Sequence, residues 1–157
     1  MTNEIRTCLW FKDGRGREAA EFYASLIPDS KVERIFEGDA GEGSFAVIDF
    51  ILGGVPYQIL DAGPHFTLTE AVSISVATDG QAETDRLWTA LTADGGEESV
   101  CGWLKDRFGV SWQIFPKRLA ELTMHSDKDI SARAMAEMMK QRKIDIAAIE
   151  AAVERHT

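Results

Sequence analysis

The amino-acid sequence predicts an α+β fold in which two units, each of one strand, one helix and three further strands, form a curved mixed sheet followed by a helical C-terminal extension. The first observation behind this prediction is a motif that occurs twice, as GVPYQIL at residues 54–60 and as GVSWQIF at residues 109–115. Four of its seven positions are identical in the two copies. The second observation is that the same order of apolar runs and helical patterns precedes each copy. Together they indicate an internal duplication.

Each predicted unit opens with a strand and a helix. The first strand lies in the apolar run 8–11 and its counterpart in the run 72–77, and an Asp-Gly pair follows each run, at residues 13–14 and 79–80. A helical pattern comes next in both units, because core residues recur at spacings of three and four on one face. These residues are Ala19, Phe22, Tyr23 and Leu26 in the first unit and Thr84, Leu87, Trp88 and Leu91 in the second.

Three more strands complete each unit. In the first unit we predict strands at 31–36 and 45–52, and in the second a short strand near 98–101 and a strand-like run at 100–105. The repeated motif then forms the return arm of a β-hairpin in both units, because its Gly follows a strand-like run. The Gly-rich stretch 38–43 is followed by another strand pattern, which makes it a hairpin connection.

The last part of the chain has no strand pattern and forms the helical extension. We expect a short helical turn at 118–122 and helices at 129–142 and 145–154, with Asp127 or Asp129 as an N-cap. Two roles are open for this extension: it can close its own sheet or clasp a partner subunit, and we favour the clasp. The predicted organisation is a single domain with units at 1–66 and 67–117 and a helical tail at 118–157.

The charge and composition of the chain exclude several classes of function. The 26 acidic residues outnumber the 17 basic ones and give a net charge of −9, whereas a nucleic-acid binder gathers basic side chains against phosphate. No apolar stretch approaches the roughly 20 residues that a membrane span needs. The N-terminus has no basic region followed by an apolar one, so we expect a cytoplasmic protein. In that compartment Cys8 and Cys101 are two reduced thiols.

A four-stranded sheet with one helix has a bare face that must be covered. Two such units form a curved sheet whose concave side is a cleft, the kind of surface on which small ligands bind. The equivalent amides Gln58 and Gln113 are either outward polar residues, alternating with Tyr57 and Trp112 in the core, or cleft groups that bind a ligand. Further candidate ligand-binding residues are Trp10, Trp103 and Lys105, and Asp61 is either a cleft group or part of a surface ion pair.

Four stretches of the sequence carry a resemblance to a known family. They are LWFKDGRGREAAEFY at residues 9–23, EAVSISVATDG at 70–80, CGWLKDRFGVSWQIFPKRLAEL at 101–122 and KIDIAAIEAA at 143–152. On these stretches the chain resembles the vicinal-oxygen-chelate (glyoxalase/bleomycin-resistance) superfamily, and within it the 3-demethylubiquinone-9 3-methyltransferase domain, also called PhnB-like. The resemblance covers nearly the whole chain. It implies paired βαβββ units of the glyoxalase/bleomycin-resistance fold, commonly assembled as a homodimer.

The resemblance also raises the question of a metal or a cofactor. Metal-using members of the superfamily draw His and Glu ligands from the first and last strands of each unit. The corresponding residues here are Arg6, Cys8, Ser73 and Ser75 in the first strands and Gln58 and Gln113 in the last ones. An amide brings no charge, so this set would hold a divalent ion poorly. The histidines His65, His125 and His156 lack metal-binding spacing. We therefore expect no metal.

The methyltransferase label implies S-adenosylmethionine, which calls for a Gly-rich turn between a strand and a helix. The stretch 38–43 precedes a strand, so we expect no cofactor. The sequence then favours a metal-independent protein that binds a small molecule in the cleft and forms a homodimer. The alternative is an enzyme that acts on a small, aromatic or quinone-like substrate, with Cys101 or Asp106 as its catalytic residue. We expect neither a nucleic-acid nor a membrane partner.

Overall fold

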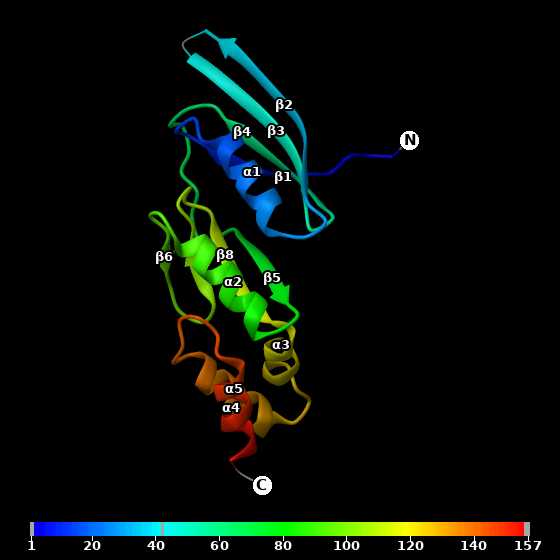
Figure 1. Ribbon diagram of the computed structural model, residues 1–157, viewed down its shortest axis with the longest axis vertical. Helices are drawn as coiled ribbons and strands as arrows, with labels where there is room; N and C mark the ends of the chain where they lie inside the picture. The colour runs from blue at the N-terminus through cyan, green and yellow to red at the C-terminus, as the bar shows by residue number, and fades with distance from the viewer. Residues whose placement is uncertain (1, 42, 156–157) are drawn as a thin grey trace. The chain divides into compact units, whose positions relative to one another are not determined.

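The structure, a computed structural model, describes residues 2–41 and 43–155 (Figure 1). The chain forms two compact units, one up to Leu68 and the other from Thr69 onward. Each unit contains a four-stranded mixed sheet with a long helix packed on one of its faces (Figure 1). The predicted α+β class and the two βαβββ units are therefore confirmed. Within the described ranges, no helix is both long enough and apolar enough to cross a bilayer.

The first unit follows the predicted order of elements. Its strands and helix are β1 (Thr7–Phe11), α1 (Gly16–Leu26), β2 (Lys31–Ala40), β3 (Gly43–Leu52) and β4 (Val55–Asp61). The strands lie in the order β1-β4-β3-β2. β1 pairs with β4 in parallel, and the other neighbours are antiparallel. The chain therefore passes from β1 through α1 to the far edge of the sheet and returns through two hairpins.

The second unit repeats this topology. Its elements are β5 (Ser73–Thr78), α2 (Gln81–Thr92), β6 (Glu97–Glu98), β7 (Trp103–Lys105) and β8 (Ser111–Pro116). The strands lie in the order β5-β8-β7-β6, with β5 parallel to β8. Gln113 of β8 lies between Ser75 and Trp103, as Gln58 of β4 lies between Cys8 and Asp49. The two glutamines thus occupy equivalent positions in equivalent strands.

The amphipathic stripes explain why each helix packs on its sheet. In α2 the four predicted core residues are all buried, and they face Ile74, Leu104, Trp112 and Ile114 of the second sheet, which are also buried. In α1 the stripe is shifted by one position, because Ala19, Ala20 and Tyr23 are buried whereas Phe22 and Leu26 are only partly covered. Small side chains let α1 approach its sheet closely. Burial of these apolar surfaces stabilises each unit.

The turn before β7 differs from the prediction. The strand predicted near 98–101 is wrong in its position, since β6 ends at Glu98 and Cys101 lies in a turn with a φ of 57°. The backbone N–H of Cys101 donates to the carbonyl of Gln141, and that of Gly102 donates to the carbonyl of Arg142, both at 2.8 Å. A distant segment thus takes the hydrogen bonds that a longer β6–β7 hairpin would make. The pattern of apolar and polar residues along the chain does not indicate that a segment forty positions away makes these hydrogen bonds.

The helical extension consists of α3 (Lys117–Thr123), α4 (Lys128–Met138) and α5 (Ile146–Glu154). Asp127 is the N-cap of α4, because its side chain accepts hydrogen bonds from the backbone of Asp129 and Ile130. α4 ends four residues before the predicted position 142, and the chain after it runs beside Cys101 and Gly102. The extension has a core of its own, made of Leu119, Leu122, Ala134, Ile144 and Ile149.

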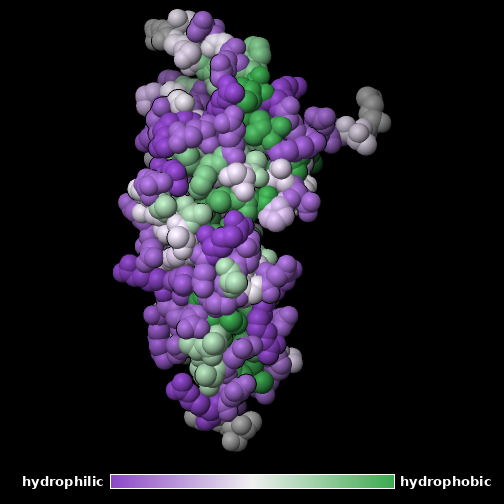
Figure 2. Space-filling model, viewed as in Figure 1, coloured by the Kyte–Doolittle hydropathy of each residue, from purple (hydrophilic) through white to green (hydrophobic). Residues whose placement is uncertain are grey.

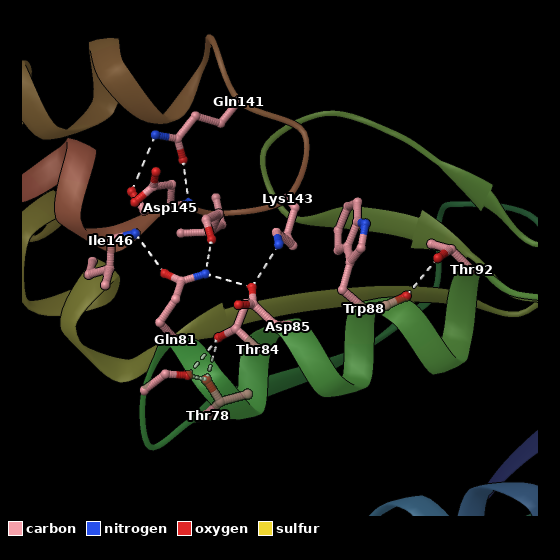
Figure 3. A network of polar contacts seen from close by, with 12 residues as sticks. Thr78, Gln81, Thr84, Asp85, Trp88, Thr92, Gln141, Lys143, Asp145 and Ile146 are labelled. Carbon is pink, nitrogen blue, oxygen red and sulfur yellow. Dashed lines mark hydrogen bonds and ion pairs between the residues drawn. The ribbon is translucent and has the colours of Figure 1, made fainter.

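A polar network joins the extension to α2 (Figure 3). The side-chain amide of Gln81 donates to the carbonyl of Ile144 at 2.8 Å and accepts from the backbone N–H of Ile146 at 2.9 Å. Lys143 also forms an ion pair of 2.8 Å with Asp85. Gln81 therefore satisfies two backbone groups at the start of α5. The extension packs on its own unit, which is one of its two predicted roles, and the clasp stays a prediction.

We predict that Gln81→Leu, which keeps the approximate size of the side chain, lowers the free energy of unfolding by about 1–3 kcal/mol, because it leaves two partly buried backbone groups without this partner. Urea unfolding followed by circular dichroism measures the change. The control is Lys143→Gln, which breaks an exposed ion pair and should cost less than about 1 kcal/mol. Equal losses in the two variants would show that Gln81 does not hold the extension.

Candidate functional site

Each sheet has one face that is turned away from its helix. Successive strand residues alternate between the two faces, so the strand register identifies this open face in both units. The open face of the first sheet carries Cys8, Trp10, Arg34, Phe36, Val47, Asp49, Gln58 and Leu60. The open face of the second sheet carries Ser73, Ser75, Trp103, Lys105, Ser111, Gln113 and Phe115. All the predicted ligand-binding residues lie on these two faces.

A polar row crosses the open face of the first sheet. The side chain of Asp49 is 3% exposed and forms an ion pair with Arg34, and it accepts a hydrogen bond of 2.8 Å from the Gln58 amide. Burial alone would raise the pKa of Asp49, but the hydrogen bonds from Gln58 and Arg34 outweigh it and lower the pKa. Gln58 is therefore engaged with a carboxylate of its own sheet.

An apolar row lies beside this polar row. Trp10 contacts Phe66 edge-on, with ring centroids 4.9 Å apart, and its indole N–H donates to the carbonyl of Gly63 at 2.9 Å. The ring lines a hollow of about 450 Å³ together with Phe45 and His65. Figure 2 shows that hydrophobic residues reach the surface in the part of the first unit that carries β2 and β3. There Phe36 is 56% exposed.

The open face of the second sheet brings several predicted residues together. Trp103 and Gln113 are direct neighbours across β7 and β8, and the Gln113 amide donates to the hydroxyl of Ser73 at 2.9 Å. Cys101, Trp103 and Gln113 line one hollow of about 260 Å³, whose other wall comes from α3 and α4 and includes Leu119 and Met138. The helical extension thus supplies part of this hollow.

Trp103 also lines a second hollow, of about 410 Å³. Lys105 and Ser111 are part of its lining, together with Glu70 from the loop before β5 and Glu97 from β6. Lys105 forms a 2.7 Å ion pair with Glu70. The hydrogen bond between them raises the pKa of Lys105 and lowers that of Glu70, so both groups stay charged at neutral pH. Sequence analysis missed Glu70, Glu97 and Ser111, because no motif marks them.

Two predicted acidic residues have structural roles. The buried carboxylate of Asp106 accepts hydrogen bonds from the backbone of Phe108 and Val110 and from the indole of Trp112, at 2.9–3.0 Å. It holds the β7–β8 turn and lies apart from the two hollows beside Trp103, so a catalytic role for Asp106 stays a prediction. Asp61 is 6% exposed and accepts hydrogen bonds from the backbone of Gly14 and Gly16 at the start of α1, and it also lines a hollow of the first unit.

The described residues do not fit a catalytic metal. In residues 2–41 and 43–155, no three His, Cys, Asp or Glu side chains gather closely enough to hold an ion, and His156 lies outside these ranges. The Gln58 and Gln113 amides are engaged with Asp49 and Ser73. Desolvation and the charge of Asp49 raise the pKa of Cys8, which disfavours the thiolate that a metal requires.

The Gly-rich stretch likewise does not fit a nucleotide cofactor. Gly38 to Ala40 belong to β2 and Gly43 begins β3, so the described residues of this stretch lead from one strand into the next and not into a helix. Backbone N–H groups at the start of a helix are what bind phosphate in such cofactor sites. The stretch lacks that element within the described residues. This stretch is therefore not the strand-to-helix turn that an S-adenosylmethionine site calls for.

Comparisons with known proteins agree with this architecture. The profile of the 3-demethylubiquinone-9 3-methyltransferase family matches residues 3–115, so the match ends before α3. A solved PhnB protein from Bacillus cereus, described as a 3-demethylubiquinone-9 3-methyltransferase, is 29% identical with a TM-score of 0.64, over 72% of this chain and 99% of that one. A Pseudomonas aeruginosa protein is 24% identical with a TM-score of 0.61, over 73% of this chain and 98% of that one. No curated protein matches the chain.

A more distant similarity concerns the fold alone. The fosfomycin resistance protein FosX from Listeria monocytogenes, solved with Mn(II) and 1S,2S-dihydroxypropylphosphonic acid, is 15% identical with a TM-score of 0.53. The alignment covers 74% of this chain and 93% of that one. Together with the strand order, these similarities identify the glyoxalase/bleomycin-resistance fold of the vicinal-oxygen-chelate superfamily.

We predict that Asp49→Asn, which keeps the shape of the side chain, lowers stability at neutral pH by about 1–3 kcal/mol, because it removes the buried charged acceptor of the hydrogen bonds from Gln58 and Arg34. The folded-state pKa of Asp49 lies below its ordinary value of 3.8, so its contribution is present above that pH and is lost as the pH falls through the folded-state pKa. Urea unfolding at a series of pH values should show the gap between variant and wild type closing in acid.

The control for this pH series is Asp39→Asn, which changes an exposed carboxylate on β2. Its difference from wild type should stay small at every pH. If the gap for Asp49→Asn is constant across the series, the carboxylate does not have the lowered pKa that its contacts imply.

Proposed function

The chain belongs to the 3-demethylubiquinone-9 3-methyltransferase family, and on this premise we propose that it binds a small organic molecule on the open face of its second sheet without a metal. The observation that carries the proposal is the convergence of Cys101, Trp103 and Gln113 on one hollow. Fold alone does not decide the function, because this fold type accommodates unrelated activities. The chemistry of these residues supports the proposal.

The hollow offers an aromatic wall and an amide. The ring of Trp103 provides a flat apolar surface, and Leu119, Phe115 and Met138 add further apolar contacts. Gln113 offers an acceptor and donors, of which one donor is engaged with Ser73. Such a lining suits a small planar or aromatic molecule with one or two polar groups. A quinone-like compound has this character.

Metal independence is supported by the residue types at the strand positions that carry metal ligands in metal-using members of the superfamily. Ser75, Gln113, Gln58 and Cys8 occupy them, and they provide hydroxyls, amides and a thiol whose pKa is raised. A divalent ion prefers charged oxygen or imidazole ligands. We therefore propose that ligand binding in the hollow beside Gln113 relies on packing and neutral hydrogen bonds.

An enzyme is the second candidate, and Cys101 is the observation that favours it. This free cysteine lines the same hollow as Gln113, where a thiolate could attack a small electrophilic substrate. The substitution Cys101→Ala separates the candidates. It abolishes turnover of an electrophilic aromatic substrate if the protein is an enzyme. If the protein only binds, it changes ligand affinity by no more than a few-fold, because the alanine still lines the hollow.

We also propose that the protein acts as a homodimer in the cytoplasm. Strands β1 and β5 lie at sheet edges within their units, and such edges can pair with another strand. Ile5 and Phe36 are large apolar side chains at 81% and 56% exposure, which favours their burial in an assembly. The free thiols of Cys8 and Cys101 suit a reducing compartment. Light scattering during size-exclusion chromatography measures the assembly.

The binding proposal predicts that small aromatic and quinone-like compounds raise the melting temperature of the protein, because a ligand that binds only the folded state stabilises it. Trp103→Ala and Gln113→Ala should each weaken the affinity of a compound found in this way by about tenfold or more, measured by isothermal titration calorimetry. The control is Met135→Ala, an exposed residue of α4 outside the hollow. Unchanged affinity in both hollow variants would place the ligand elsewhere.

A further inference from the structure

The hollow of about 410 Å³ beside Trp103 contains a buried hydroxyl that the fold does not use. Ser111 lines this hollow at 2% exposure, and among the described residues its Oγ has no hydrogen-bond partner. Its cross-strand neighbours are Ser73 and Lys105. The hydroxyl of Ser73 accepts from Gln113, and the ammonium of Lys105 is paired with Glu70. A buried hydroxyl without a partner destabilises a fold and requires an explanation.

The charge around Ser111 indicates what kind of group would use this hydroxyl. Three carboxylates and one ammonium line the hollow, since Glu70, Glu97 and Glu98 accompany Lys105. Glu70 forms the ion pair with Lys105, and Glu98 accepts a hydrogen bond of 2.8 Å from Trp88. Glu97 lies opposite Lys105 in the β6–β7 register and is exposed. The hollow is negative overall, as is the whole chain at −9, so it disfavours an anionic ligand.

Trp103 supplies the remaining feature. Its indole is part of the lining of the same hollow and is only partly buried. The face of a tryptophan ring attracts an organic cation, and a carboxylate close by strengthens that attraction. The hollow therefore combines carboxylates, a tryptophan ring and a hydroxyl without a partner among the described residues. Together these groups suit an organic cation that also carries a hydrogen-bonding group.

We propose that this hollow binds a small organic ammonium compound, with its cationic group between Trp103 and Glu97 and a hydrogen-bonding group on Ser111. The proposal rests on the proposed function and specifies the chemical class of the ligand, or of one part of it. Lys105 is neutralised by Glu70 and so does not repel the cation. A ligand that reaches past Trp103 can fill both hollows, since this residue lines each of them.

The test compares two compounds of the same shape. Choline carries a trimethylammonium group and a hydroxyl, and 3,3-dimethylbutan-1-ol is its uncharged carbon analogue. Calorimetric titration of the full chain should show choline binding at least about tenfold more tightly than the analogue. Glu97→Gln should remove most of this preference. The control Glu121→Gln, an exposed carboxylate on α3, should preserve it.

Ser111→Ala should change stability and binding in opposite directions. Removing an unsatisfied buried hydroxyl should raise the melting temperature of the free protein by about 2 °C or more. The same change should weaken choline binding several-fold, because the ligand loses its hydrogen bond. A hydroxyl that serves only packing would leave the affinity unchanged, and that result would overturn its role in recognition.

Two outcomes would overturn the inference as a whole. The first is equal affinity for choline and its analogue, which would show that the hollow does not recognise charge. The second is that none of the organic ammonium compounds choline, 2-phenylethylamine and benzyltrimethylammonium binds. If neutral aromatic compounds still bind through Gln113 in that case, the proposed function stands and only the ligand class is wrong. If they fail as well, both proposals are wrong.

Discussion

In each unit the first strand pairs in parallel with the last. In the first unit the pairing runs from Thr7 opposite Tyr57 to Phe11 opposite Asp61. In the second unit it runs from Ser73 opposite Ser111 to Thr78 opposite Pro116. Because side chains alternate along a strand, this register determines which residues pack under the helix and which remain on the open face. Trp112 and Ile59 are directed into the cores, so Gln113 and Gln58 must lie on the open faces. A shift of one residue would bury both amides, so core packing and site geometry depend on the same pairing.

The two open faces have diverged from this common plan. In the first sheet the position next to Gln58 is Asp49, whose buried carboxylate is satisfied by Gln58 and Arg34. In the second sheet the position next to Gln113 is Trp103, an aromatic residue that lines two hollows. The central amide of the first face donates to a buried carboxylate, whereas that of the second face donates to Ser73 and lies next to a tryptophan ring. The duplication thus provides the scaffold, and single residues decide the chemistry.

Sequence reasoning succeeded where the signal was local. The repeated motif, the helical stripe of α2 and the N-cap Asp127 could all be predicted, because each depends on residues a few positions apart. It failed at Cys101 and Gly102, because their hydrogen-bond partners Gln141 and Arg142 are forty positions away. Ser111 was overlooked because its significance lies in a missing partner. Hydrogen-bond satisfaction is a property of the folded chain and has no sequence pattern.

We propose that neutral groups on the open faces do the work that charged metal ligands do elsewhere in the superfamily. The most direct test is the divalent-metal content of the protein, purified without chelators or a metal-affinity step and measured by plasma mass spectrometry. We predict far less than one ion per chain, because amides and hydroxyls bind such ions weakly. One equivalent per chain in the wild type that disappears in Gln113→Ala would contradict the claim, because Gln113 would then be a metal ligand.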